Sequence, residues 1–202
     1  MRFYQNAFLL SSFLMFFQSC GNKQITEYYT FGDEGINQQY EVDRLFGYLN
    51  GVATTYTIEG NLLSKYHYRR GKAHGRAEMY CESGAQLFSK AHFVNDQIDG
   101  IYEEYFCENG QLRAKVLYDL GKLVEVSEIF DRKGDSLFSG DHSDGNGTVL
   151  KYDEYGNLSN RFTIKNGLVD GYFVSITNTG YKDSTLYVNG YNEEQDYHFS
   201  LY

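Results

Sequence analysis

The stretch Gly100–Leu123, GIYEEYFCENGQLRAKVLYDLGKL, holds the pattern that decides the fold. Two runs rich in Tyr, Val and Leu flank the turn signal Glu108-Asn109-Gly110. Each run is about eight residues long, which suits a strand and is too short for a free-standing helix. Gly supplies the positive φ that a tight hairpin turn requires. The stretch is therefore predicted to form a β-hairpin.

The same pattern repeats along the chain with a period of roughly two dozen residues. Glycines recur at matching places, with Glu125 where one copy lacks its Gly, and aromatic or aliphatic residues keep phase between them. A single hairpin cannot bury enough surface to be stable, so neighbouring copies must stack. The glycines predicted to mark the repeat and its turns are Gly51, Gly60, Gly71, Gly75, Gly84, Gly100, Gly110, Gly121, Gly134, Gly147, Gly156, Gly167, Gly171 and Gly180.

The predicted fold is all-β: an elongated, single-layer antiparallel meander of tandem β-hairpins. We expect the repeats over residues 47–194, with a polar tether and a degenerate first repeat over 21–46 and a C-terminal tail over 195–202. The chain has 20 Tyr and 15 Phe but no Pro, which would remove a ladder hydrogen bond from a central strand. The net charge of -9 argues against a nucleic-acid partner, because phosphate contacts need clustered Lys and Arg.

Residues 1–20 are predicted to be a targeting segment. Arg2 precedes the uncharged stretch Ala7–Phe17, which is shorter than the ~20 residues that span a bilayer and matches the apolar region of a signal peptide. The sequence FQSC at 17–20 resembles the lipobox of bacterial lipoproteins, in which the Cys is acylated. The resemblance implies lipid on Cys20 and a place in the bacterial cell envelope, at the periplasmic face or the outer membrane. An ordinary secreted protein and an uncleaved anchor are the alternatives.

The repeats themselves resemble a known family. The matching stretches are YFCENGQL at 105–112, YDLGKL at 118–123, GKAHG at 71–75 and NGLVDG at 166–171. They are similar to the MORN-repeat variant, some bacterial members of which carry the name YwqK-type antitoxin. The resemblance covers roughly residues 47–194. It implies a single-layer sheet of hairpins, and the family occurs in proteins with many roles.

Two cysteines remain after the targeting segment. Cys81 and Cys107 stand at the same distance before a turn Gly, which makes them equivalent positions of neighbouring hairpins. Equivalent strands lie two strand spacings apart, about 9.6 Å, whereas a disulfide needs Cα atoms within about 7 Å. We therefore predict two unpaired, solvent-facing thiols.

No catalytic residue, metal site or cofactor is predicted. The five His show no metal-ligand spacing with Cys or Asp, and no nucleophile and base occur in a recognisable arrangement. The segment Asp141–Gly147 looks faintly like a calcium loop, but the later Glu and the helical frame are missing. A polar turn is the favoured interpretation.

Glu78, Glu103 and Glu128 occupy one repeat position, with Glu104 and Glu108 beside them. Such a stripe either keeps the sheet soluble or docks a basic protein, and rows of Tyr either pack or bind a partner. The expected function is a non-enzymatic scaffold or protein-binding module with an unidentified protein partner, bound to a membrane through Cys20. An antitoxin-like or immunity protein that neutralises a toxin is the alternative, suggested by the family name.

Overall fold

The computed structural model describes residues 21–28, 36–177, 179–180, 182–192 and 197–198. Strands joined by turns make up these residues, with no helix among them, and the predicted all-β antiparallel meander is confirmed. The predicted signal segment 1–20, and Cys20 with it, lies outside the described residues.

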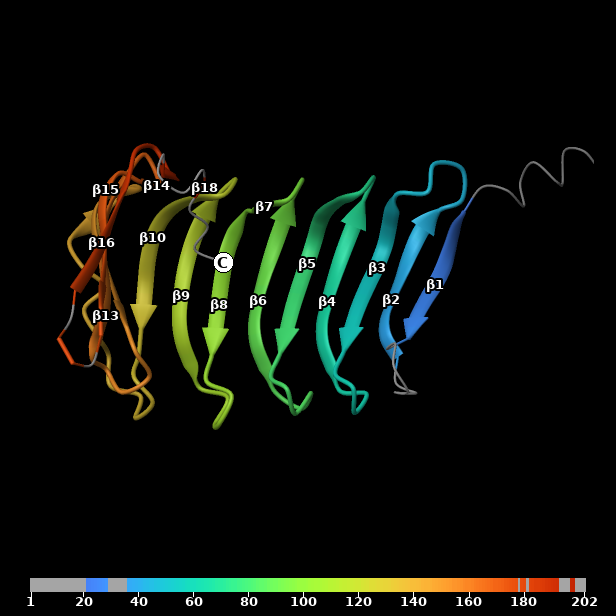
Figure 1. Ribbon diagram of the computed structural model, residues 1–202, viewed down its shortest axis with the longest axis horizontal. Helices are drawn as coiled ribbons and strands as arrows, with labels where there is room; N and C mark the ends of the chain where they lie inside the picture. Colours follow the sequence, from blue (N-terminus) through green and yellow to red (C-terminus); the bar gives the residue numbers. More distant parts are fainter. Residues whose placement is uncertain (1–20, 29–35, 178, 181, 193–196, 199–202) are drawn as a thin grey trace, which may run out of the picture.

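The main sheet has ten strands, and strands consecutive in sequence lie side by side in it (Figure 1). Its order is β1 to β6, then β8 to β10, while β7 pairs only with β6. Residues 21–46, predicted to hold a tether and a degenerate first repeat, include β1 and β2. The strands are β1 (Asn22–Tyr28), β2 (Ile36–Asp43), β3 (Leu49–Tyr56), β4 (Leu62–Arg69), β5 (Lys72–Tyr80), β6 (Leu87–Val94), β7 (Gln97–Ile98), β8 (Gly100–Tyr105), β9 (Leu112–Asp119) and β10 (Lys122–Ile129).

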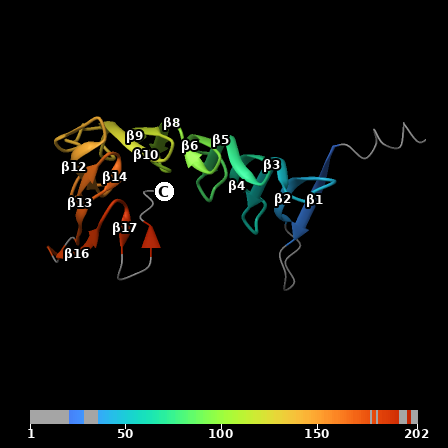
Figure 2. The same ribbon diagram turned by 90° about the horizontal axis from the view of Figure 1, so that it is seen from above.

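A second sheet follows in the order β11-β12-β13-β15-β16, with β14 pairing β13, and a short hairpin β17–β18 ends the described chain. Figure 2 shows that the second sheet turns away from the line of the main sheet, so the two enclose an angle. The single layer therefore becomes two layers at the C-terminal end. The strands are β11 (His142–Ser143), β12 (Asn146–Tyr152), β13 (Leu158–Lys165), β14 (Leu168–Val169), β15 (Gly171–Ile176), β16 (Lys182–Tyr187), β17 (Tyr191–Asn192) and β18 (Tyr197–His198).

Two-residue turns stack the hairpins along the upper edge of the main sheet in Figure 1. In the turn Arg70-Gly71 both φ values are positive, 53° and 80°, as a hairpin turn with the twist of its strands requires. The amide of Gly71 also donates to the carbonyl of Leu49 in the preceding hairpin, at 2.8 Å. The turn Leu120-Gly121 repeats this bond to Ile98 at 2.7 Å. Each turn thus closes its own hairpin and binds it to the preceding one.

Five glycines of the predicted repeat lie within strands and not in turns. Gly75, in β5, is opposite Phe93 of β6. Its φ is 108°, and a Cβ there would lie 3.3 Å from the Cβ of His67, at a bulge between β4 and β5. A side chain there is therefore strained by the backbone conformation and has a tight contact with His67. The corresponding pairs are Gly51 with Tyr68, Gly100 with Tyr118, Gly147 with Ile164 and Gly171 with Tyr187.

A disulfide joins Cys81 and Cys107, whose Cα atoms lie 5.7 Å apart, so the prediction of two unpaired thiols is wrong. The reason is the place of the Gly within the turn. The two turns are equally long, since Tyr80 pairs with Leu87 and Tyr105 with Leu112. Gly84 donates its amide to the carbonyl of Cys81, whereas Gly110 stands one place later and donates to Phe106. Phe106 therefore occupies the place of Cys81, and Cys107 is the next residue along its turn. Cys81 is also buried, at 7% exposed, and not solvent-facing.

The disulfide is one of several links between neighbouring turns along the lower edge of Figure 1. The Asn61 amide group donates to the carbonyl of Glu82 in the next turn, at 3.1 Å. Arg132 forms ion pairs with Glu108 of the turn before it and with Glu154 of the turn after it. Covalent and polar links together hold the lower turns in register.

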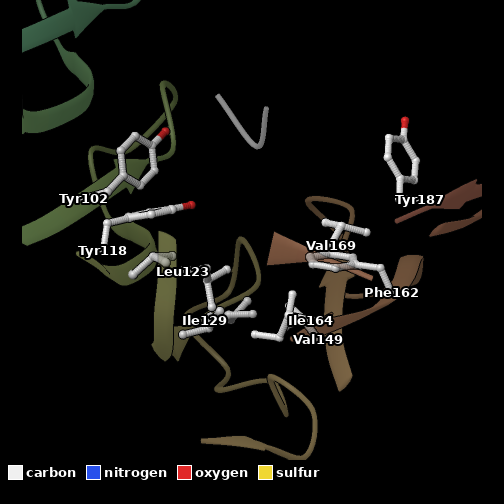
Figure 3. Packing of buried hydrophobic residues seen from close by; sticks show 11 residues of the cluster. Tyr102, Tyr118, Leu123, Ile129, Val149, Phe162, Ile164, Val169 and Tyr187 are labelled. Carbon is white, nitrogen blue, oxygen red and sulfur yellow. The ribbon is translucent and has the colours of Figure 1, made fainter. Parts of the chain in front are cut away.

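The hydrophobic core lies where the second sheet faces β8–β10 (Figure 3). Phe162 and Val149 of the second sheet are each 1% exposed, and the Phe162 ring stacks on Phe173 with centroids 5.2 Å apart. From the main sheet come Tyr102 and Leu123. Burial of each large apolar side chain contributes about 1.5–3 kcal/mol. This core therefore holds the angle between the sheets.

Candidate functional site

The face of the main sheet that the second sheet packs against, here called the inner face, carries a row of apolar residues. In register, Tyr66 of β4 pairs with Ala77 of β5, and Ala77 pairs with Ala91 of β6. On the next two strands of the sheet, Tyr102 of β8 pairs with Val116 of β9. Because Ala77 and Ala91 are small and stand between two Tyr, the row is hollowed at β5 and β6.

This hollow is the inner groove, a cavity of about 410 Å³. That size suits a small ligand or a few side chains of a partner. The second sheet covers one side of it but stops short of β4 and β5. Its lining includes Tyr66, Ala77, Met79, Phe93, Tyr102, Tyr118 and Leu123 from the main sheet and Ile164, Leu168 and Val169 from the second sheet.

Aromatic rings form much of the wall of the inner groove. Tyr66 contacts Phe93 with ring centroids 5.9 Å apart, and burial raises the pKa of the Tyr66 phenol. Burial and then the charge of Asp96 raise the pKa of the neighbouring Tyr68. The phenols therefore stay neutral near pH 7. Asp96 lies at the edge of the groove, where its carboxylate accepts the amide of Ala73 at 2.7 Å.

The described residues of the inner groove offer apolar contact, neutral hydroxyls and the Asp96 carboxylate, and there is no His, Cys or Lys among them. Within the described residues no three His, Cys, Asp or Glu side chains gather as a metal site. The segment Asp141–Gly147 forms a short hairpin, with β11 and β12 joined by the turn Asp144-Gly145. The site is suited to binding apolar groups.

The outer face carries the predicted glutamate stripe, and lysines interrupt it. Lys90 pairs in register with Glu78 on one side and Glu103 on the other. The Lys90 ammonium contacts the Glu103 carboxylate, and this bond, followed by one from Tyr105, lowers the pKa of Glu103. The whole row, here called the charge ladder, runs Lys65, Glu78, Lys90, Glu103, Lys115 and Glu128. It carries little net charge.

Glu104 lies apart from the other stripe residues. It sits on the inner face, where it forms an ion pair with Arg113 at 2.7 Å. Arg113 also donates to the carbonyl of Tyr152 in the second sheet, at 3.3 Å. Burial lowers the pKa of the adjacent Lys151, partly offset by the charge of Glu104. These polar contacts brace the two sheets at the lower end of their junction.

No protein-family model matches the chain, and no curated protein matches it. The resemblance to MORN-repeat variants stays a prediction. In the part of the chain that the structure describes, no helix is long and apolar enough to cross a membrane.

Sequence reasoning missed the inner groove because the folding back of the second sheet leaves no mark on the repeat. One signal was present. Ala53, Ala77 and Ala91 stand at strand positions whose counterparts Tyr66 and Val116 are large. A run of small residues inside an aromatic row indicates a hollow in the face that they line.

Proposed function

We propose that this chain is a non-enzymatic binding module, held at the bacterial cell envelope by lipid on Cys20. Its inner groove receives an apolar, aromatic-bearing segment of a partner protein. The observation that carries the proposal is the open 410 Å³ groove walled by Tyr66, Phe93 and Tyr118. Binding energy at protein interfaces concentrates in such pockets, where Tyr is enriched. The lysines of the charge ladder favour the groove over the glutamate stripe as the place of recognition.

The disulfide supports the proposed place in the cell. Disulfides persist in oxidising compartments and are rare in the cytosol. Cys81 and Cys107 lie in neighbouring turns with their Cα atoms 5.7 Å apart, so the bond links two hairpins of the main sheet directly. A signal segment that exports the chain would deliver it to such a compartment.

Photo-crosslinking in the bacterium that makes the protein tests the groove. Met79 lines the groove and is 40% exposed, so Met79→p-benzoylphenylalanine places a reactive ketone at its opening. Ile101, 51% exposed on the outer face of β8, is the matched control. We expect one discrete adduct from position 79 and none from position 101.

Ala77→Phe completes the test by filling the groove. The side chain would occupy the hollow between Tyr66 and Ala91, so the adduct at position 79 should disappear while the circular dichroism of the sheet is retained. Equal adducts at positions 79 and 101, or an adduct that survives the filled groove, would exclude the groove as the binding site. Labelling with fatty acid that is equal in the wild type and Cys20→Ala would separately exclude the lipid anchor.

A further inference from the structure

One end of the main sheet collects features that suit a membrane surface. The strand β1 begins at Asn22 on the upper edge of the sheet in Figure 1. The loop of residues 44–48 between β2 and β3 and the turn of residues 69–72 between β4 and β5 lie on the same edge. These three segments, residues 21–23, 44–48 and 69–72, are here called the rim. The folded chain thus leaves the site of the proposed lipid anchor directly into the rim.

Hydrogen bonds join the parts of the rim into one platform. The Asn50 amide group donates to the side-chain oxygen of Asn22 at 3.0 Å, and the backbone amide of Arg70 donates to the side-chain oxygen of Asn50 at 3.4 Å. The amide of Arg44 donates to the carbonyl of Gly21 at 3.2 Å. The start of β1, the loop and the turn therefore keep a fixed arrangement.

The loop exposes two large apolar side chains at its tip. Leu45 is 62% exposed and Phe46 is 73% exposed. The Asp43 carboxylate accepts the amides of Leu45 and Phe46 at 2.9 and 3.0 Å, so the loop is held closed with both side chains outside it. The Phe46 ring stacks on Tyr48, with centroids 5.6 Å apart. An exposed Leu-Phe pair on a rigid loop is the apolar element of an interfacial membrane contact.

Cations flank this tip in a protein that is acidic overall. Arg69, Arg70 and Lys72, with Asn95, line a second hollow on the rim. Acids beside the rim are engaged within the fold: Glu41 accepts the Asn22 amide group at 3.0 Å, Asp43 caps the loop, and Asp96 accepts the amide of Ala73. An anionic surface would therefore attract the rim.

We propose that the rim docks on an anionic phospholipid bilayer. Leu45 and Phe46 enter the interface, and Arg69, Arg70 and Lys72 bind lipid phosphates. The proposal extends the proposed function, in which Cys20 carries lipid: the lipid holds the protein at the membrane, and the rim fixes its orientation. The strands then stand upright on the bilayer with the lower edge farthest from it.

Tryptophan fluorescence tests the orientation, because the chain contains no Trp. Phe46→Trp places a single fluorophore at the tip of the rim. Ile58→Trp places one in a lower turn, where Ile58 is 45% exposed, and serves as the matched control. Each full chain is reconstituted into vesicles of phosphatidylcholine and phosphatidylglycerol that contain brominated lipid. We expect blue-shifted, quenched emission from Trp at position 46 and unchanged emission at position 58.

Removal of the cations tests the lipid-phosphate contact. Each cation near an anionic surface strengthens binding about fivefold, so R69Q/R70Q/K72Q should weaken docking on the order of a hundredfold. Quenching at position 46 should then fall to the level seen in vesicles of phosphatidylcholine alone, with circular dichroism unchanged. Equal quenching at positions 46 and 58, or quenching that persists without the three cations, would overturn the proposal. Fatty-acid labelling of Cys20 is scored on the same samples, so failure of the anchor and failure of the rim are read separately.

Discussion

Removal of the Cys81–Cys107 disulfide should destabilise the centre of the main sheet. The two residues are 26 apart in sequence, and the loop-entropy relation for a cross-link of this length gives about 3.5 kcal/mol. For the double variant Cys81→Ser, Cys107→Ser this corresponds to a fall in the urea midpoint of about 1–3 M. Because β1–β3 are joined to β5–β9 only through the pairing of β4, the loss of hydrogen-exchange protection should concentrate in β5–β9 and spare β1–β3.

Reduction provides the control for this experiment. Dithiothreitol should lower the midpoint of the wild type to that of the double variant and leave the double variant unchanged. An unmoved midpoint on reduction would refute the reasoning, as would an equal loss of protection in β1–β3. The first result would mean that the polar links of the lower turns already hold the hairpins in register.

Four further results are expected from single positions. Cys81→Asp, in a chain with Cys107→Ser, should recover about 1–2 kcal/mol in urea unfolding, because Asp131 at the same turn position accepts two backbone amides at 2.9 Å. Phe162→Ala should cost about 3–5 kcal/mol in thermal unfolding, and Phe138→Ala, 61% exposed, should change stability by less than about 0.5 kcal/mol. Gly75→Ala should cost about 1–3 kcal/mol by the same assay, given its φ of 108° and its contact with His67. The pKa of Glu103 is lowered from its ordinary value of 4.5, so its bond to Lys90 stabilises the fold at pH values above 4.5 and ceases to do so as the pH falls through the folded pKa. The wild type should therefore be more stable than Lys90→Gln at pH 7, and the difference should shrink as the pH falls below 4.5.

The hairpins could be predicted from the sequence because their signals are local. A turn such as Glu108-Asn109-Gly110 and the strands beside it are fixed by residues within one repeat. The return of the second sheet is fixed by contacts such as those among Leu123, Val149 and Phe162, which lie far apart in sequence. No periodic pattern encodes such a contact, so the small residues Ala77 and Ala91 were the one mark that the inner groove left in the sequence.

Two predictions failed because the wrong positions of neighbouring hairpins were treated as equivalent. Counting back from the turn glycines made Cys107 the equivalent of Cys81, whereas Gly110 stands one place later in its turn than Gly84, as its hydrogen bond to Phe106 shows. Counting one position per repeat found Glu78 and Glu103 but passed over Lys90, which stands between them on the other strand of the hairpin. The charge ladder is visible only when both strands of each hairpin are counted.

The two proposals together constrain the partner. A strand of eight residues is about 26 Å long, so a sheet that stands on its rim places its lower edge about that far from the bilayer. The inner groove lies between the edges, at the level of Ala77 and Ala91, and opens along the membrane and not away from it. A segment bound there runs within about 20 Å of the lipid surface, which a partner held on the same membrane can reach, and we propose such a partner. We therefore expect the adduct at position 79 to sediment with the membrane fraction in Cys20→Ala as well as in the wild type. An adduct that is soluble in Cys20→Ala would show that the partner reaches the membrane only through the lipid of this chain.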